Sequence, residues 1–187
     1  ELNVDPENIL AVTFTNKAAK EIRTRINEMI YPYQMGSWLY TFHAFGLKIL
    51  REHAVDLNLG YRNDFTIIDS DESKDLIRDI LKKLKIESKD LSLGYAKEAI
   101  SRHKMMIESI FEPLVTDVYR EYKLELIKNN LMDFDDLIRY VLDLFEMNES
   151  ILTKYQKQFK YVLVDEFQDT DKVQYEIIKL INSKNTF

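Results

Sequence analysis

The stretch YVLVDEFQDT, residues 161 to 170, places a group of acidic side chains directly after an apolar run. If the run forms a buried strand, Asp165 and Glu166 lie just beyond its carboxyl end, where open parallel sheets bind their ligands. At such a position one carboxylate can hold Mg²⁺ beside a phosphate, while its neighbour orients and deprotonates a water molecule. The pattern therefore indicates Asp165 as a magnesium ligand and Glu166 as the base of a phosphoryl-transfer site.

The same acidic turn permits two other interpretations. It can be a solvated turn after a strand, with Asp169 or Thr170 capping the next helix. Clustered carboxylates also bind paired metals in nucleases, but here no histidine supports them and all three carboxylates lie on one short turn. The length of the whole string, four apolar residues followed by Asp-Glu-Phe-Gln-Asp-Thr, favours the nucleotide site.

A nucleotide site also needs a loop that binds phosphate. Such a loop would read Gly-x-x-x-x-Gly-Lys-Ser/Thr, with backbone N–H groups and the lysine around the phosphates. The four glycines of this chain are Gly36, Gly46, Gly60 and Gly94, and none of them is followed by lysine. The acidic turn therefore outlines one half of an ATPase site, and these 187 residues do not contain the other half.

Composition limits the remaining possibilities. With 187 residues and 45% hydrophobic content, the chain can bury one substantial core and a smaller one. A net charge of -6 argues against coating nucleic acid by bulk electrostatics, but a local groove with stacked aromatics remains possible, since aromatics make up 12%. The sequence has neither a membrane-span nor a secretion-signal pattern. The lack of cysteine excludes disulfides and thiolate metal sites and fits a cytoplasmic location.

The hydrophobic pattern predicts α/β structure at both ends of the chain and helices between them. Two apolar runs, Ile9 to Thr15 and Tyr161 to Val164, are typical of buried strands, and an amphipathic helical pattern follows each. Asp69 with Glu72 predicts a capping box that begins the helical middle of the chain. The simplest architecture is a parallel-sheet core interrupted by a helical insertion over residues 55 to 130. Other predicted elements are a helix capped by Thr15 or Asn16, a loop at Tyr31–Ser37, a strand at Trp38–Thr41, a helix marked by Phe42 and Phe45, an extended piece at Phe65–Ile68, and helices at Leu93–Ile107, Leu114–Asn129, Asp133–Phe145 and Ile151–Gln158.

Four segments, in this order, carry a family resemblance: ILAVTFTNKAAKEIRTRI (9 to 26), TFHAFGLKIL (41 to 50), LMDFDDLI (131 to 138) and YVLVDEFQDT (161 to 170). Together they closely resemble the N-terminal half of the superfamily 1 DNA helicases of the UvrD/Rep/PcrA type, over nearly the whole chain. The resemblance implies a RecA-like motor core of the P-loop NTPase type. Residues 1–54 would be the first part of motor subdomain 1A, residues 55–130 the inserted helical subdomain 1B, and residues 131–187 the return of 1A with its Walker B segment.

Family members carry their phosphate loop just upstream of the segment that here begins at Ile9, and a second motor domain downstream. On that resemblance, the chain is expected to be a fragment of a larger protein and inactive by itself. The parent protein is expected to be an ATP-dependent DNA helicase or translocase that uses ATP and Mg²⁺ to move 3′ to 5′ on single-stranded DNA and at single/double-strand junctions. The alternatives are a non-catalytic module that binds DNA or a partner, and the helicase half of a helicase-nuclease of the RecB or AddA type.

The resemblance also implies roles for residues of the acidic turn. Asp165 would bind magnesium, Glu166 would be the catalytic base, and Gln168 would sense the γ-phosphate and relay its presence towards the DNA-binding face. Family members often have tyrosine at the position of Phe167, and both residues occur there.

Five residues match the DNA-contact positions of the family. Phe14 would lie against a base, with Thr15 and Asn16 in the same strand-end loop, and Thr41 and His43 would contact the DNA backbone. The alternative for Phe14 is the last buried residue of a strand. The alternative for His43 is a hydrogen-bonded structural residue, which is also the expectation for two other histidines, His53 and His103.

Two further patterns have plain structural interpretations. Asp133, Asp135 and Asp136 are interpreted as helix-capping and first-turn acids without a catalytic role. Seven basic residues in the predicted insertion are interleaved with acids, which is typical of a solvated face, although contact with duplex DNA is the alternative. These residues are Lys82, Lys83, Lys85, Lys89, Lys97, Arg102 and Lys104.

Overall fold

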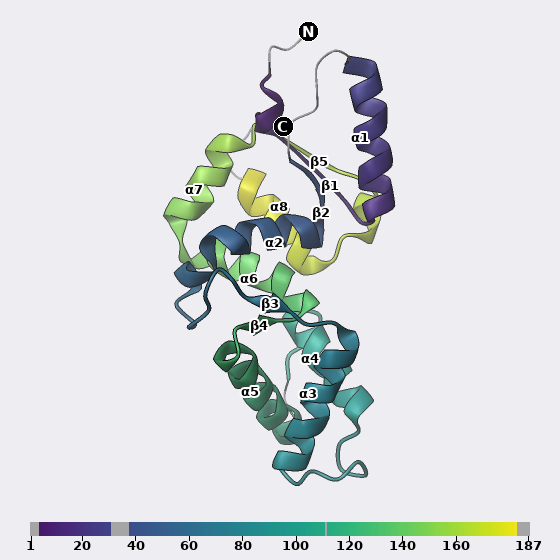
Figure 1. The fold of residues 1–187 in the computed structure, drawn as a ribbon, viewed down its shortest axis with the longest axis vertical. Coiled ribbons are helices and arrows are strands. Elements are labelled where there is room, and N and C mark those ends of the chain that lie inside the picture. Colours follow the sequence, from purple (N-terminus) through teal and green to yellow (C-terminus); the bar gives the residue numbers. More distant parts are fainter. Residues whose placement is uncertain (1–3, 31–37, 111, 183–187) are drawn as a thin grey trace. The chain divides into compact units, whose positions relative to one another are not determined.

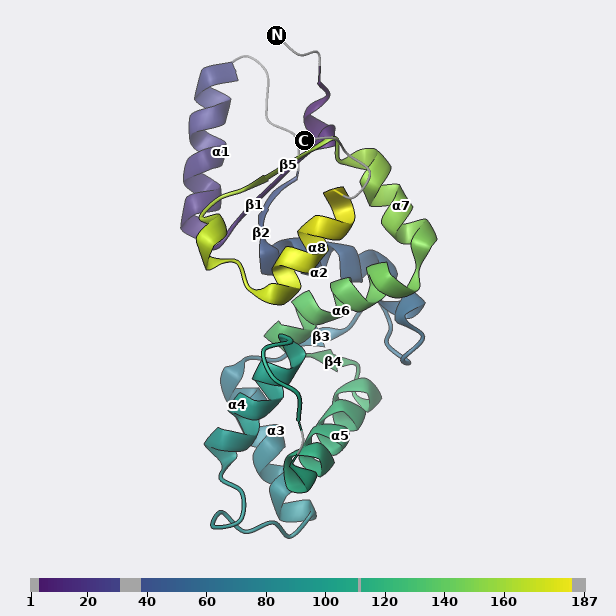
Figure 2. The same cartoon turned by 180° about the vertical axis from the view of Figure 1, so that it is seen from behind.

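The structure is a computed structural model that describes residues 4–30, 38–110 and 112–182, so the loop predicted at Tyr31–Ser37 lies outside the described residues. The chain divides into two compact units. The sheet unit comprises residues 1–49 and 141–187, and the helical unit comprises residues 50–140. Figures 1 and 2 show the two units from opposite sides.

The sheet unit is built on three parallel strands. Strand β1 (Ile9–Thr13) lies between β2 (Leu39–Thr41) and β5 (Tyr161–Val164), which gives the order β2-β1-β5. Ala11 pairs with Leu39 on one side, and Val12 pairs with Val164 on the other. All three strands therefore end at the same edge of the sheet, and the segments that follow them meet there. The first strand ends two residues before the predicted Thr15.

Helices cover both faces of this sheet. Figures 1 and 2 show helix α1 (Asn16–Ile30) on one face and helices α2 (Phe42–His53), α7 (Glu149–Gln158) and α8 (Lys172–Asn182) on the other. The second face is packed by aromatic residues, among them Trp38, whose ring centroid lies 4.9 Å from that of Phe159. Both helices predicted at Phe42 and Ile151 are present, with slightly different bounds. Short 3₁₀ turns, Pro6–Asn8 and Phe167–Asp169, precede β1 and follow β5.

Side chains at the strand ends begin the next helices. The Thr15 hydroxyl accepts a hydrogen bond from the backbone N–H of Ala18 at 3.1 Å, and the Thr41 hydroxyl accepts one from Ala44 at 3.2 Å. Such caps satisfy N–H groups that have no partner in the first turn of a helix. The predicted cap at Thr15 is thus confirmed, and its use as a cap explains why β1 stops early.

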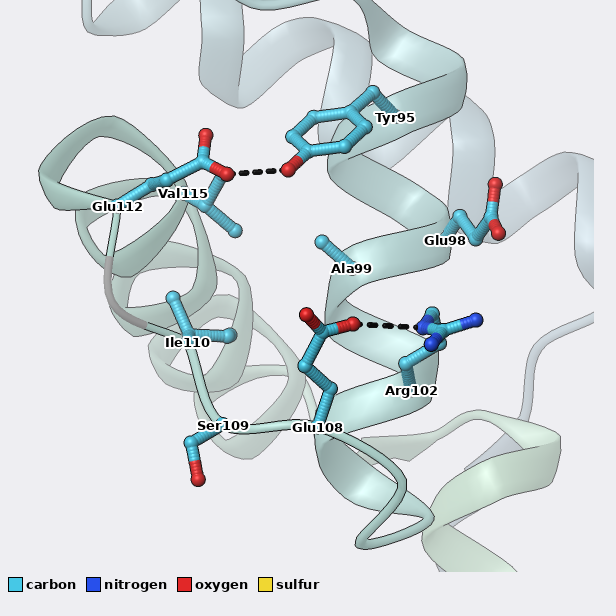
Figure 3. A pocket seen from close by; sticks show the side chains of 9 residues that line it. All are labelled: Tyr95, Glu98, Ala99, Arg102, Glu108, Ser109, Ile110, Glu112 and Val115. Carbon is cyan, nitrogen blue, oxygen red and sulfur yellow. Dashed lines mark hydrogen bonds and ion pairs between the residues drawn. The ribbon is translucent and has the colours of Figure 1, made fainter.

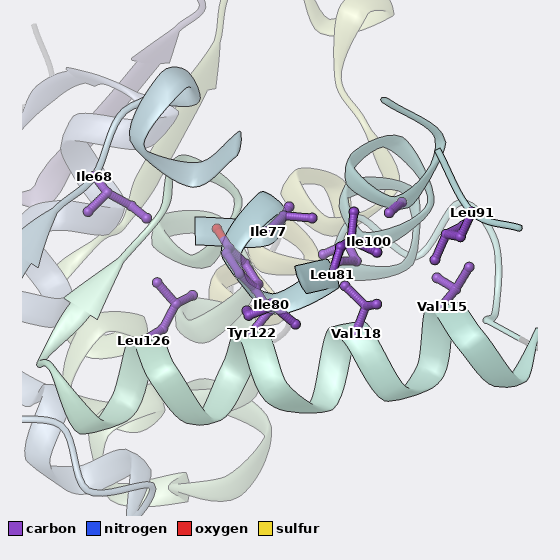
Figure 4. Close-up of a cluster of buried hydrophobic side chains, with 11 residues drawn as sticks. Ile68, Ile77, Ile80, Leu81, Leu91, Ile100, Val115, Val118, Tyr122 and Leu126 are labelled. Carbon is purple, nitrogen blue, oxygen red and sulfur yellow. The ribbon is translucent and has the colours of Figure 1, made fainter. Parts of the chain in front are cut away.

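Helices α3 (Ser70–Lys83), α4 (Leu93–Lys104) and α5 (Pro113–Lys128) lie wholly within the helical unit. The predicted capping box is present, since Asp69 accepts from the N–H groups of Asp71 and Glu72 while Glu72 accepts from Asp69. The three helices bury a shared apolar cluster that includes Ile77, Ile100, Val118 and Leu126 (Figure 4). Helical periodicity predicted helices in this part of the chain, and the structure has them because each helix turns one apolar stripe inwards.

The helical unit is not wholly helical, so the prediction of an all-helical insertion over residues 55 to 130 is wrong, although the extended piece predicted at Phe65–Ile68 is confirmed by a strand there. Strands β3 (Thr66–Ile67) and β4 (Leu131–Met132) form a two-stranded parallel sheet, and a 3₁₀ turn spans Ala54–Leu57. Helix α6 (Phe134–Met147) follows β4 directly and has residues in both units. The structure thus has parallel β-sheet in both units, and it is an α/β structure overall.

A buried polar network lies at the start of α6. Asp133 and Asp136 cap this helix reciprocally, because each carboxylate accepts a hydrogen bond from the backbone N–H of the other residue. The Lys104 ammonium donates to Asp133 and lies beside Asp136, and the Tyr122 hydroxyl also donates to Asp133. The predicted capping role of Asp133 is confirmed. Lys104, which is predicted from the sequence to lie on a solvated face, is instead buried, with 4% of its surface exposed.

Candidate nucleotide and nucleic-acid site

The acidic turn lies at the carboxyl edge of the three-stranded sheet. Asp165 is the first residue after β5, and its backbone N–H donates to the carbonyl oxygen of Val12 at 3.0 Å, which extends the pairing of β5 with β1. The side chain of Thr13, the last residue of β1, donates to Oδ2 of Asp165 at 3.2 Å. The carboxylate is therefore anchored to the central strand while it remains exposed to solvent.

Glu166 has a left-handed backbone conformation, with φ of 50° and ψ of 45°. Residues other than glycine rarely adopt it, and such strain is concentrated at functional sites. The side-chain amide of Gln168 donates to Oε2 of Glu166, and the 3₁₀ turn Phe167–Asp169 brings the two side chains together. Glu166 is exposed, so its carboxylate is accessible to water and to a ligand.

The acidic residues fit a magnesium ion that is shared with a nucleotide. Mg²⁺ in such sites is held by one or two carboxylates together with phosphate oxygens and water, rather than by a cage of protein ligands. Asp165 offers one exposed carboxylate, anchored through its second oxygen by Thr13. Among the described residues, no group of three or more His, Asp or Glu side chains could enclose a metal. This donor set suits a shared Mg²⁺ and does not suit a two-metal nuclease centre.

Two cavities are poor candidates for the phosphates. The cavity of about 210 Å³ between α1 and the sheet reaches Asp165, but apolar side chains such as Ile22, Ile26 and Leu163 line it. The cavity of about 270 Å³ in the helical unit is lined by Glu98, Glu108 and Glu112, and its one arginine is paired with Glu108 (Figure 3). Neither an apolar wall nor an acidic rim favours a polyphosphate, because neither provides a positive partner for the negative charge of the phosphates.

Phe14 lies immediately beyond β1, at the same edge of the sheet as the acidic turn. Its ring is only half-buried, and its centroid lies 5.6 Å from that of Phe42. Phe14 is therefore not the fully buried last residue of a strand, in contrast to Phe42, which is 2% exposed and belongs to the core as expected. Thr15 and Asn16, which follow it, are both exposed. A half-buried ring next to exposed polar residues suits stacking on a base.

The second pair of predicted DNA-contact residues lies at the start of α2. Thr41 is only 8% exposed and its hydroxyl caps the helix, so its side chain already has a structural role. His43 is half-buried and lies near Asp171. Burial raises the pKa of the Asp171 carboxyl above its ordinary value, although the charge of His43 opposes that shift. His43 is thus the more accessible of the two for a phosphate oxygen.

The other histidines have the structural surroundings that were expected. Nδ1 of His53 lies 3.0 Å from a carboxylate oxygen of Asp56, and the ring of His103 packs edge-on against Tyr119. Both residues belong to the helical unit.

Most basic residues of the helical unit are paired with acids. On α3, Lys74, Arg78 and Lys82 each contact an aspartate three positions earlier. Lys83 lies 2.8 Å from Glu121, and Lys89 lies 2.8 Å from Glu87. These pairs form a nearly neutral surface, which supports the interpretation of a solvated face and leaves little free charge there for duplex DNA.

Two features of the site were missed in the sequence. The cap of α8 is Asp171, whose carboxylate accepts from the N–H of Gln174 at 2.9 Å, and not Asp169 or Thr170. The pattern Asp-x-x-Gln at 171 to 174 is a capping-box signal that could have identified it. The bond between Thr13 and Asp165 joins residues 152 positions apart, and no local pattern announces it.

Comparisons with known proteins agree with the motifs. The whole chain, residues 1–187, matches the family model described as the UvrD/REP helicase N-terminal domain. The chain is 39% identical over 194 residues to the ATP-dependent DNA helicase PcrA of Staphylococcus epidermidis (strain ATCC 35984), and 38% identical to that of Staphylococcus aureus (strain Mu50). Each alignment covers 98% of this chain and 26% of the relative, so the chain spans about a quarter of the length of these proteins.

The described helices include none that is both long and apolar enough to cross a membrane. With the family model matched from end to end and two relatives aligned over nearly all of the chain, the chain belongs to the UvrD/REP helicase N-terminal domain family.

Proposed function

We propose that this chain is part of the motor of an ATP-dependent helicase or translocase that moves 3′ to 5′ on single-stranded DNA. In this proposal the sheet unit is motor subdomain 1A and the helical unit is the inserted subdomain 1B. Chromosomal DNA as the substrate would place the protein in the compartment that holds DNA, which in a bacterium is the cytoplasm. The observation that carries the proposal is that Phe14 and Asp165 directly follow two neighbouring parallel strands, β1 and β5, at one edge of the sheet.

The nucleotide half of the mechanism rests on the acidic turn. Asp165 would bind Mg²⁺, which when bound with ATP neutralises charge on the phosphates. Glu166 would orient a water molecule and take its proton, since its exposed carboxylate lies next to the magnesium ligand in the chain. The amide of Gln168, which donates to Glu166, would respond to the γ-phosphate because it can exchange one acceptor oxygen for another.

The DNA half of the mechanism lies on the same edge. Phe14 would stack on a base, with Thr15 and Asn16 beside it. His43 and Thr41, whose hydroxyl caps α2, would contact the DNA backbone. Stacking and phosphate contacts do not depend on base identity, which is what movement along any sequence requires. Single/double-strand junctions would be the sites at which movement becomes unwinding.

The chain by itself is proposed to be inactive, because its sequence contains no phosphate-binding loop pattern. A second motor domain, which would supply an arginine to the transition state, is proposed to lie elsewhere in the parent protein. An arginine of this kind accounts for about 10³-fold or more in comparable NTPases.

The proposal is tested by unwinding assays on the intact protein with partial duplexes that carry a single-stranded tail at either the 3′ or the 5′ end. ATP-dependent unwinding of the 3′-tailed duplex alone is expected. Unwinding of the 5′-tailed duplex alone would contradict the direction, and DNA binding without ATP hydrolysis would support the non-catalytic alternative. Degradation of the strands would indicate a helicase-nuclease.

A further inference from the structure

Thr13 lies at the centre of the candidate site, yet no role has been assigned to it. It is the last residue of β1, the middle strand of the sheet, and it is 2% exposed. On one side it is paired in register with Thr41, and on the other side its hydroxyl reaches the carboxylate of Asp165. The next residue in the chain is Phe14. Thr13 is therefore hydrogen-bonded to the proposed magnesium ligand, Asp165, and is followed in the chain by the proposed base-stacking residue, Phe14.

The geometry of the hydrogen bond is suited to positioning a metal ligand. The Thr13 hydroxyl donates to Oδ2 of Asp165 at 3.2 Å, and the other carboxylate oxygen is available for a cation. The backbone of Asp165 is fixed by the hydrogen bond from its N–H to the carbonyl oxygen of Val12. Only rotation about the side-chain torsions can then change the orientation of the carboxylate. A donor on a buried, rigid strand removes that freedom, which is how partners of metal-ligating carboxylates act in known sites.

We propose that Thr13 is a positioning residue for the magnesium carboxylate, and that its hydroxyl holds Asp165 in the orientation that binds the metal. The inference rests on the proposed function, in which Asp165 is the magnesium ligand. Valine has nearly the same shape as threonine and would pack as well at this buried position in a strand, so packing alone does not require the hydroxyl. The hydroxyl does have an acceptor, and that acceptor is the carboxylate of Asp165.

A purely structural role makes a different prediction. If the bond served only to satisfy a buried hydroxyl, its removal would change the free energy of unfolding and leave the affinity for metal unchanged. If it orients the carboxylate, the affinity for metal would fall even where the fold is intact. Removal of a donor also leaves more negative charge on the carboxylate, but for an exposed side chain we expect the loss of orientation to outweigh that gain.

The experiment measures Mn²⁺ binding to the intact protein by electron paramagnetic resonance, in the presence of a non-hydrolysable ATP analogue. The variants are Thr13→Val, Thr13→Ser and Asp165→Ala. The matched control is Thr24→Val, which removes the hydroxyl of an exposed threonine on α1 that bonds only within its own helix. Because the analogue is not hydrolysed, the readout is metal affinity and is independent of turnover.

Thr13→Val is expected to lower the affinity for Mn²⁺ by about 10-fold to 100-fold, the usual effect of removing a partner of a metal ligand. Thr13→Ser should stay within about twofold of the unmodified protein, because it keeps the donor, and Thr24→Val should not differ from it. Cooperative thermal unfolding of each variant checks the fold. If Thr13→Val does not fold, Thr13→Ala is measured in its place.

Three outcomes would overturn the inference, and they are distinguishable. If Asp165→Ala abolishes Mn²⁺ binding while Thr13→Val leaves it within about twofold, Thr13 is a structural residue and the proposed function stands. If Asp165→Ala itself has no effect, the assignment of the metal ligand fails, and the proposed function fails with it. A folded Thr13→Ser variant with the affinity of Thr13→Val would also contradict the role of the hydroxyl.

Discussion

The ammonium of Lys104 lies 2.8 Å from a carboxylate oxygen of Asp136, and the two side chains are 3% and 1% exposed. A second carboxylate, that of Asp133, lies 2.6 Å from the same nitrogen. One buried cation thus serves two buried acids at the first turn of α6. Burial alone would lower the pKa of Lys104, but the two carboxylates hold it above its ordinary value, so the lysine is charged.

Lys104→Met should destabilise the protein strongly. The substitution leaves two carboxylates buried without their cation, and breaking a buried ion pair in this way typically costs about 3–5 kcal/mol. Urea unfolding monitored by circular dichroism measures the change. The control is Lys82→Met, which breaks an ion pair whose two side chains are both largely exposed, and little change is expected there. Similar effects of the two variants would contradict the account of the network.

The same network should make stability depend on pH. Burial, with the neighbouring Asp133, raises the pKa of Asp136 from 3.8 to about 7, although Lys104 opposes the shift. A raised folded-state pKa of an acid stabilises the fold fully below the unfolded value of 3.8, and that stabilisation is lost as the pH rises through about 7. Burial would also raise the pKa of Asp133, but Lys104 holds it below the ordinary value, so its own contribution is lost only in acid.

Between about pH 5 and pH 8, the unmodified protein should therefore lose stability relative to Asp136→Asn, which has no proton to release. The thermal midpoints of both proteins across this range test the prediction. The histidines are present in both proteins, so any contribution from them cancels in the difference. A difference between the two midpoints that does not change with pH would contradict the raised pKa of Asp136.

The cap of α8 gives a third prediction. Asp171→Ala should destabilise the protein by about 0.5–2 kcal/mol, because the N–H of Gln174 loses its acceptor. Asp171→Asn should cost much less, since asparagine is an equally good cap. Asp169→Ala is the matched control, as it removes an acid two residues earlier in the same turn. If urea unfolding showed that Asp169→Ala lowers the free energy of unfolding more than Asp171→Ala does, Asp169 rather than Asp171 would be the cap of α8.

These residues also illustrate what the sequence could and could not predict. The capping box at Asp69, the strand at Tyr161–Val164 and the apolar faces of the helices follow from local patterns, because caps and periodicity involve residues a few positions apart. The burial of Lys104 does not, since the nearby cation Arg102 is exposed and the two carboxylate partners of Lys104, Asp133 and Asp136, lie far along the chain at the start of α6. The bond between Thr13 and Asp165 likewise depends on which strands lie side by side.

The order of the motifs predicted which segments lie together at one edge of the sheet, but not how their side chains are held there. Phe14, Asp165 and Glu166 do meet at one edge of the sheet, as parallel strands require. The left-handed backbone at Glu166 was not predictable, because it depends on the tertiary positions of the flanking segments, whereas the cap at Thr41 joins residues only three positions apart.

Phe14→Ala should weaken binding of single-stranded DNA to the intact protein and leave ATP binding unchanged. Loss of one stacked base costs about 1–3 kcal/mol, which corresponds to roughly 5-fold to 150-fold in affinity. Fluorescence anisotropy with a labelled oligonucleotide measures the loss. Tyr95→Ala, which removes an exposed aromatic ring from the helical unit, is the control and should have no such effect. If Phe14→Ala left the affinity for DNA unchanged, Phe14 would have only a structural role, in packing against Phe42.

The central claim is that Glu166 is the base of an ATPase that single-stranded DNA activates. It is tested most directly by the rate of DNA-stimulated ATP hydrolysis in the intact protein with Glu166→Gln, alongside Glu149→Gln on α7 as a matched control. We expect Glu166→Gln to bind ATP normally and to lose turnover by about 10²-fold to 10⁴-fold, the usual contribution of a general base, while Glu149→Gln keeps the unmodified rate. Normal DNA-stimulated turnover by Glu166→Gln would contradict the account.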